Sequence, residues 1–185
     1  MSDLERGLHD ARDVAAARDR GDAGAFARLV ERYSAGLAAL AYDRLGSVPD
    51  AQDAVQETFA QAYARLASLR EPERFAGWIH EILRALCAMR IRRKGVERKY
   101  LARMAEETPT IGFATPLDRM ISRERDEKLR KAVASLSTPL REAVALRYMS
   151  DMGRTEAAAL LDIGQDAFDK RLERALRELR ERMRD

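Results

Sequence analysis

The sequence predicts an all-α protein made of two small helical domains that a flexible linker joins. Three observations support this fold class. Alanine, leucine, arginine and glutamate, which favour helices, abound in the 185-residue chain, whereas aromatic residues make up only 6% of it. Apolar residues recur at steps of three and four along several stretches, as on the buried face of a helix. A long segment without such a stripe separates these stretches into two groups.

This pattern divides the chain into four segments. Residues 1–21 are polar and rich in alanine and arginine, and we treat them as an N-terminal extension without an assigned role. Residues 22–95 form a first helical domain, and residues 126–185 form a second. Between them, residues 96–125 predict a linker, in which helix-breaking and turn residues recur: Thr108, Pro109, Gly112, Thr115 and Pro116. Any flexible tether would share this composition.

The first domain opens with a turn at Gly21, and Asp22 is the expected N-cap of a helix that ends before Gly46. Asp50 is the expected N-cap of a second helix, which reaches about Leu66. Helical spacing places the polar residues of that helix on one outer face: Asp50, Asp53, Gln56, Glu57 and Gln61. In an arbitrary helix such a face is most often simply solvated.

A third helix is expected to begin near Pro72 or Arg74 and to stop at Gly95. Its apolar residues include Trp78, which burial statistics alone would assign to the core. Basic residues crowd its outer face and its end. Between Arg84 and Arg103 the sequence has eight basic residues and one acid, a concentration typical of a nucleic-acid-binding surface.

The second domain begins with a short apolar stripe, after which Thr138-Pro139 opens a helix. Residues 155–161 form a short helix, residues 162–165 a turn, and Asp166 begins the last helix. A short helix, a tight turn and a longer basic helix are typical of a helix-turn-helix, whose second helix enters the major groove. A plain helical hairpin has the same outline.

The remaining composition narrows the class of protein. A single cysteine, Cys87, excludes an internal disulfide, and two histidines, His9 and His80, provide no zinc-site spacing. Charges interrupt every apolar run, so no membrane insertion or signal peptide is expected, and we expect a soluble, cytoplasmic protein. No nucleophile–base or carboxylate constellation stands out. We therefore expect no catalytic residues, no cofactor and no metal.

The sequence motif Asp50-Ala-Gln-Asp53-Ala-Val-Gln-Glu57-Thr-Phe resembles the second conserved region of bacterial sigma factors. The resemblance implies that this face docks on the clamp helices of RNA polymerase, through Asp50, Asp53, Gln56, Glu57 and Gln61. The stretch Phe75-Ala-Gly-Trp78-Ile is similar to the family helix that captures and melts the −10 promoter element. It implies DNA contacts from Arg70, Arg74, Phe75, Trp78, Arg84, Arg90, Arg92, Arg93 and Lys94. Ala85 stands where the family usually has asparagine.

Residues from Leu136 onwards resemble the fourth conserved region, which reads the −35 element. The implied DNA-binding residues are Thr155, Gln165, Asp166, Asp169, Lys170, Arg171 and Arg174. Asp166 and Asp169 place negative charge where phosphate contacts are expected. They could read a cytosine, repel phosphate, or cap the helix and complement its dipole.

Both regions together resemble sigma factors of the extracytoplasmic-function type (sigma-70 family, group 4). The resemblance implies a monomeric, non-enzymatic protein whose partners are the RNA polymerase core (β and β′ subunits), promoter DNA and an anti-sigma factor. The alternative is a sigma-like decoy or interaction protein that binds polymerase or an anti-sigma factor without promoter recognition, and Ala85, Asp166 and Asp169 favour it. A stand-alone helix-turn-helix regulator ranks third, because no dimer seam is visible.

Overall fold

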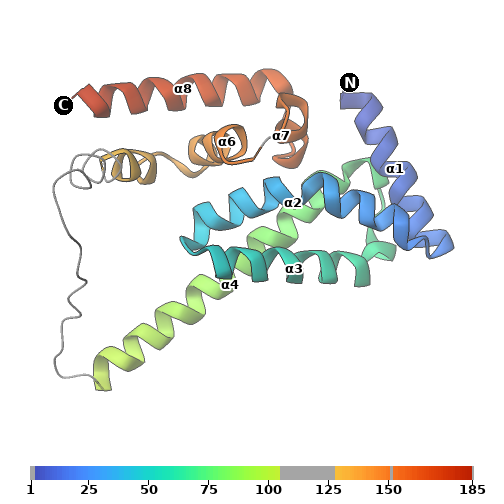
Figure 1. The fold of residues 1–185 in the computed structure, drawn as a ribbon, viewed down its shortest axis with the longest axis horizontal. Coiled ribbons are helices and arrows are strands. Elements are labelled where there is room, and N and C mark those ends of the chain that lie inside the picture. The colour runs from blue at the N-terminus through green and yellow to red at the C-terminus, as the bar shows by residue number, and fades with distance from the viewer. Residues whose placement is uncertain (1–2, 105–127, 151, 185) are drawn as a thin grey trace, which may run out of the picture.

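The computed structural model describes residues 3–104, 128–150 and 152–184, and every regular element within these ranges is a helix (Figure 1). The elements are α1 (Asp3–Arg20), α2 (Ala23–Leu45), α3 (Val48–Ala64), η1 (Leu66–Ser68), η2 (Pro72–Arg74), α4 (Phe75–Met104), α6 (Thr138–Tyr148), α7 (Arg154–Leu160) and α8 (Gln165–Arg184). Residues 128–134 are also helical. The predicted all-α class with two helical domains is confirmed. Most of the predicted linker lies outside the described residues.

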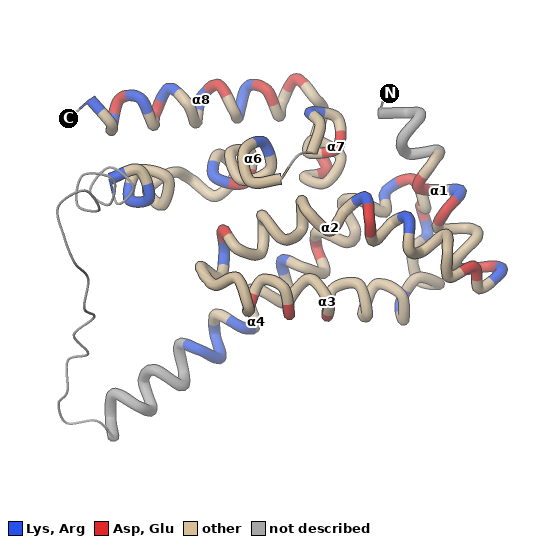
Figure 2. The backbone as a smooth tube through the Cα atoms, viewed as in Figure 1, with Lys and Arg blue, Asp and Glu red and all other residues tan. Residues whose placement is uncertain are grey.

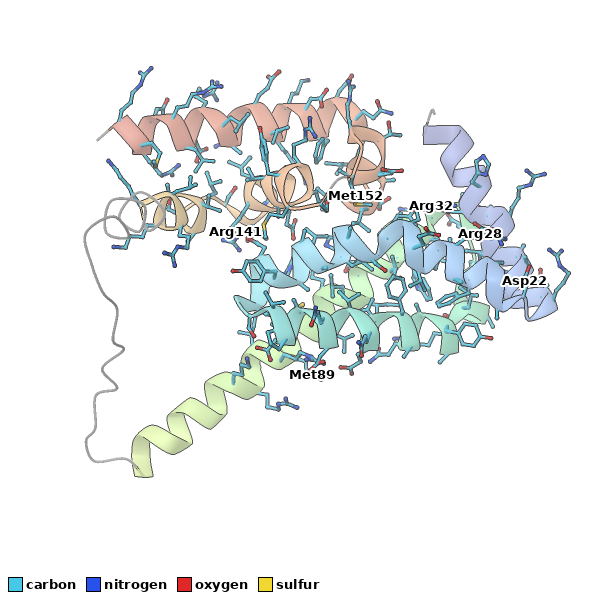
Figure 3. The ribbon with its side chains drawn as sticks, in the orientation of Figure 1. Asp22, Arg28, Arg32, Met89, Arg141 and Met152 are labelled. Carbon is cyan, nitrogen blue, oxygen red and sulfur yellow. The ribbon has the colours of Figure 1, made fainter. Side chains whose placement is uncertain are left out.

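Helix α1 is an integral part of the first domain, which the sequence did not indicate. Val14 is completely buried against the core, and two acids on α1 reach basic residues of α2. The Asp13 carboxylate accepts hydrogen bonds from Arg28 (Nη2 at 2.7 Å), and Asp10 is buried against Arg32 and the hydroxyl of Tyr33. Figure 3 shows Arg28 and Arg32 on the α2 face towards α1. These pairs and the buried Val14, Ala16 and Ala17 together attach α1 to the domain.

Local signals explain where α2 and α3 begin and end. Asp22 is the N-cap of α2, as predicted, and accepts a hydrogen bond from the Ala25 backbone N–H at 3.0 Å. Gly46 ends α2 in the left-handed region (φ 67°), which glycine adopts without a Cβ penalty. The predicted N-cap of α3 is wrong: Ser47, not Asp50, caps the helix. Proline in its first turn needs no N–H partner, so α3 starts earlier, at Val48.

Helix α4 begins at Phe75 as expected, after the short turn η2, but it does not stop at Gly95. It continues to Met104, so the predicted end was wrong. A single glycine inside a helix costs only about 1 kcal/mol relative to alanine. The residues that follow, Val-Glu-Arg-Lys-Tyr-Leu-Ala-Arg-Met, are mostly good helix formers, which explains the continuation. In Figure 1, α4 extends well beyond the helices that pack on it.

The second domain contains the predicted helix-turn-helix. Helix α6 begins at Thr138 with Pro139 in its first turn, and α7 and α8 follow with a tight turn between them. Asp162 in that turn adopts φ 52°, a conformation that aspartate tolerates better than most residues. Phe168 and Leu160, almost fully buried, fix α8 against α7. We refer to α1–α4 as the N-terminal module and to residues 128–150 and 152–184 as the C-terminal module.

The hydrophobic core continues from one module into the other. The largest cluster of buried apolar side chains unites Leu37 and Ile79 of the N-terminal module with Leu146, Met152 and Leu160 of the C-terminal module. A smaller, separate cluster holds α6 and α8 together through Leu140 and Leu179, among others. In this conformation the two modules are docked against each other rather than separate.

Candidate nucleic-acid interface

The predicted acidic face lies on the outside of α3. Ala51, Ala54, Val55 and Phe59 of the same helix are buried, whereas Asp53 and Gln56 are exposed and Asp50, Glu57 and Gln61 are half-buried. The Gln61 side-chain amide donates to Glu57 Oε1 at 3.3 Å. The helix therefore presents the five polar residues on one surface, as the spacing predicted.

Two basic residues that the sequence assigned to DNA instead contact this acidic face. Arg90 Nη2 donates to Glu57 Oε2 at 2.8 Å, and only 18% of the Arg90 side chain is exposed. Lys94 donates to the Asp50 carboxylate, and this hydrogen bond is the main cause of a lowered pKa of Asp50. The outer face of α3 and the basic half of α4 are therefore one connected surface. Figure 2 shows the lysines and arginines that follow one another on this part of α4.

A cavity of about 1120 Å³ lies between the two modules, and most of the other predicted −10 residues line it. Five of them line it, namely Arg70, Arg74, Trp78, Arg84 and Arg92. Arg84 pairs with Glu81 one turn earlier on α4, at 2.7 Å. Arg93 is exposed on α4 outside the cavity lining. The cavity thus gathers a basic, aromatic-containing wall, which is a combination typical of single-strand nucleic-acid binding.

Phe75 and Trp78, both predicted to contact DNA, differ in burial. The Phe75 ring is completely buried, with its centroid 5.8 Å from that of Tyr33. Trp78 is half-buried and leans on Phe75, with ring centroids 6.0 Å apart and planes at 49°. Phe75 therefore supports the surface from beneath, while Trp78 has a face in the cavity.

The predicted −35 residues lie on α7 and α8 of the helix-turn-helix and differ in exposure. Asp166, Lys170 and Arg174 are exposed, and the others are half-buried: Thr155, Gln165, Asp169 and Arg171. Arg154, the first residue of α7, was not among the predicted residues. Its Nε lies 3.1 Å from Asp169 Oδ2 and its Nη2 lies 3.5 Å from Asp166 Oδ1. Arg154 therefore offsets the negative charge of both acids. In the sequence, the position of Arg154 directly before the predicted residue Thr155 was the feature that could have indicated this role.

Two titratable groups in the core have pKa values shifted by burial. Desolvation lowers the pKa of His80, which is packed beside Glu142 of the C-terminal module. Desolvation also raises the pKa of the buried Cys87 thiol. Among the described residues, no group of histidine, cysteine and acidic side chains has the geometry of a metal site. No helix within the described ranges is long and apolar enough to cross a membrane.

Comparison with known proteins identifies two matching families. Sigma-70 region 2 matches residues 29–96, and Sigma-70, region 4 matches residues 126–179. The chain is 27% identical over 173 residues to the ECF RNA polymerase sigma factor SigW of Bacillus subtilis, covering 90% of this chain and 92% of that protein.

Two solved structures are also similar to the chain. One is CnrH in complex with the cytosolic domain of CnrY (TM-score 0.56, 26% identity, 92% of this chain and 94% of that chain). The other is the sigma factor RpoE in complex with the anti-sigma factor NepR from Bartonella quintana (TM-score 0.53, 25% identity, 86% of this chain and 96% of that chain).

Proposed function

The chain belongs to the extracytoplasmic-function group of the sigma-70 family, and we propose that it binds the RNA polymerase core and directs promoter recognition, −10 opening and transcription initiation. One observation carries this function. A single chain holds a helical module with a basic, Trp-containing wall and, after it, a helix-turn-helix, each matching a sigma region in the expected order. A protein of this kind acts by binding, without enzymatic chemistry, in the cytoplasm where the polymerase is found.

The basic wall supplies the means to stabilise an opened strand. Unstacking a base step costs a few kcal/mol. A base stacked on an aromatic side chain such as Trp78 returns roughly 1–3 kcal/mol, and arginines contact the backbone phosphates without regard to sequence. Arg70, Arg74, Arg84 and Arg92 line the same cavity as Trp78, which supports this role.

The acidic face of α3 is the proposed polymerase site. We expect Asp53→Lys to weaken binding of the chain to core polymerase while leaving the fold intact, because Asp53 is exposed and makes no ion pair among those found in the described residues. Charges at the rim of an interface mainly set association rate and salt dependence. The measurement is core affinity by fluorescence anisotropy at two salt concentrations. Glu31→Lys, the same charge change at an exposed position of α2, is the matched control. Equal affinity of both variants for core polymerase would mean that the acidic face of α3 is not part of the polymerase interface.

Helix α8 is proposed to read the −35 element. Arg154 pairs with Asp166 and Asp169 of this helix and so changes how both acids are expected to affect DNA binding. Asp169→Lys adds a cation and releases Arg154 from its 3.1 Å pair. We expect tighter binding of holoenzyme to −35 duplexes of any sequence, with the log–log salt slope steeper by about one unit or more. Anisotropy over a salt series measures this. Glu181→Lys, exposed near the far end of α8, should change the slope less. A preference altered at one base pair, with the average affinity constant, would mean instead that Asp169 reads a base.

A partner of the anti-sigma class is part of the proposal. Both similar solved structures are complexes, of CnrH with the cytosolic domain of CnrY and of RpoE with the anti-sigma factor NepR. Their likeness to this chain supports a protein partner that binds it in the same way.

A gel shift on promoter fragments with and without core polymerase tests the function as a whole. The proposed function requires tight promoter binding only with core. A chain that binds promoter equally well alone would be an independent regulator. One that binds core without opening promoters would be a decoy.

A further inference from the structure

The cavity of about 1120 Å³ between the two modules is large enough to hold a small molecule. Pockets that bind such ligands typically measure about 300–1,000 Å³. The lining comes from both modules: Trp78 and Arg92 lie on α4, and Leu161 and Asp162 lie in the turn of the helix-turn-helix. The proposed −10 surface accounts for only one wall of this space.

The charges in the lining leave two arginines available to an anion. Every acid that lines the cavity is engaged by an arginine of the same lining, in the pairs Arg44–Glu142, Arg74–Asp162, Arg74–Glu71 and Arg84–Glu81. Arg70 and Arg92 also line the cavity, but both are exposed and neither has an ion pair among those found in the described residues. Guanidinium groups bind phosphate through two parallel hydrogen bonds, so these two arginines suit a phosphorylated ligand.

Trp78 and two alanines shape the wall that α4 contributes. Trp78, Ala85, Ala88 and Arg92 follow one another at helical steps and all line the cavity, so they lie on one face of the helix. The half-buried Trp78 offers an aromatic face on which any nucleobase can stack. Ala85, where the family resemblance led us to expect asparagine, contributes space rather than a hydrogen-bonding group.

Two side chains of the lining have buried nitrogen atoms without a hydrogen-bond partner among the described residues, Arg44 Nε and His80 Nε2. The His80 side chain is only 8% exposed. Buried polar atoms are almost always paired, so two unpaired ones beside the same cavity indicate that a polar group belongs there. Because burial lowers the pKa of His80, its imidazole is neutral near pH 7 and Nε2 can either donate or accept a hydrogen bond.

We propose that this cavity binds a free purine nucleoside triphosphate. The base stacks on Trp78, Arg70 and Arg92 hold the phosphates, and polar groups of the nucleoside approach the buried His80 and Arg44. A purine is favoured because its larger ring buries more area on the indole. A bound nucleotide and an opened strand would exclude each other at Trp78. This consequence, unlike the binding itself, rests on the proposed function of α4.

The length of the α4 wall favours a chain of phosphates over a single one. Arg92 follows Trp78 by 14 residues, which corresponds to about 21 Å along the helix at 1.5 Å per residue. Side chains on a helix point towards its N-terminus, so the Arg92 guanidinium extends back in the direction of Trp78. A long arginine side chain and a triphosphate together bridge this separation, whereas a nucleoside monophosphate leaves Arg92 without a contact.

Isothermal titration calorimetry of the full-length free chain with ATP, in EDTA, tests the proposal. Adenosine supplies the base without phosphate, and inorganic triphosphate supplies the charge without a base. We expect ATP to bind at one site, and inorganic triphosphate to bind about fivefold to a hundredfold more weakly, as the loss of one stacked base predicts. Adenosine and AMP should also bind more weakly than ATP. ATP, but not inorganic triphosphate, should quench the fluorescence of Trp78, the only tryptophan.

Two variants with matched controls locate the site. Arg92→Gln should lower the affinity for ATP about tenfold or more, the usual effect of losing a hydrogen bond to a charged group. Arg180→Gln, at an exposed position of α8 outside the lining, should bind as the wild type does. Ala85→Phe fills the cavity without changing its charge and should abolish ATP binding. Met89→Phe, at an exposed position of α4 outside the lining, is its control. Circular dichroism checks that every variant keeps its helicity.

Three outcomes would overturn the proposal. ATP binding no tighter than that of inorganic triphosphate would mean non-specific attraction of anions. Equal affinity of well-folded Ala85→Phe and Met89→Phe for ATP would place the nucleotide outside this cavity. Binding of oligothymidine without any binding of free ATP would reserve Trp78 for a strand. These measurements involve neither polymerase nor promoter, whereas failure of the proposed function would appear in the gel shift with core polymerase.

Discussion

Phe75→Ala is expected to lower the free energy of unfolding by roughly 3–5 kcal/mol, the usual cost of deleting a fully buried phenylalanine. The ring is 0% exposed and lies between Tyr33 of α2 and Trp78 of α4. Its removal would leave a cavity at the point where α2 and α4 meet, because neighbouring rings can only partly collapse into it. Urea unfolding followed by circular dichroism measures the change as a lower midpoint at constant slope.

Met89→Ala is the matched control for Phe75→Ala. It lies on the same helix, and 51% of the residue is exposed, so we expect a change below about 1 kcal/mol. Equal stability of the two variants would contradict the assignment of Phe75 to the core. A Phe75→Ala chain of wild-type stability that binds single strands less well would return Phe75 to the DNA surface.

Arg44→Glu is expected to have the second large effect, on the docking of the modules. The change would place a second carboxylate against Glu142, whose side chain is only 9% exposed. Breaking a buried ion pair on one side typically costs about 3–5 kcal/mol, because a charge is left buried without a partner. Here the modules can separate and rehydrate both carboxylates, which costs less than unfolding. We therefore expect a larger radius of gyration by small-angle X-ray scattering, with helicity retained. Acrylamide should also quench the fluorescence of Trp78, the only tryptophan, more strongly, because Trp78 lines the cavity between the modules.

The double variant Arg44→Glu with Glu142→Arg restores opposite charges in reverse order and is expected to recover much of the docked arrangement of the two modules. The cycle of two single variants and the double variant isolates the coupling between the two side chains. Arg177→Glu, the same charge change at an exposed position of α8, is the control, and its modules should stay docked. Absence of any recovery in the double variant would mean that Arg44 acts by packing rather than by its pairing with Glu142.

Several features of the fold could be predicted because they depend on residues close together in the chain. The caps at Asp22 and Gly46, the start of α4 and the helix-turn-helix outline follow from spacing and turn residues within a few positions. The outer face of α3 follows from helical periodicity in the same way. Where local signals competed, the prediction was wrong: Ser47 rather than Asp50 caps α3, and Gly95 does not end α4.

The sequence by itself determined the helices and their buried faces, and its motifs indicated the family. Only the tertiary structure decided which polar groups meet. Arg90 and Lys94 turn towards the acids of α3, and Arg154 towards those of α8. Phe75 and Trp78 lie three residues apart, yet only the second reaches the cavity. The physical reason is the range of the interactions. Helix formation is decided by interactions within a few residues. An ion pair such as Arg44–Glu142, in contrast, joins residues 98 positions apart in the sequence, and only the packing of the helices brings them together in space.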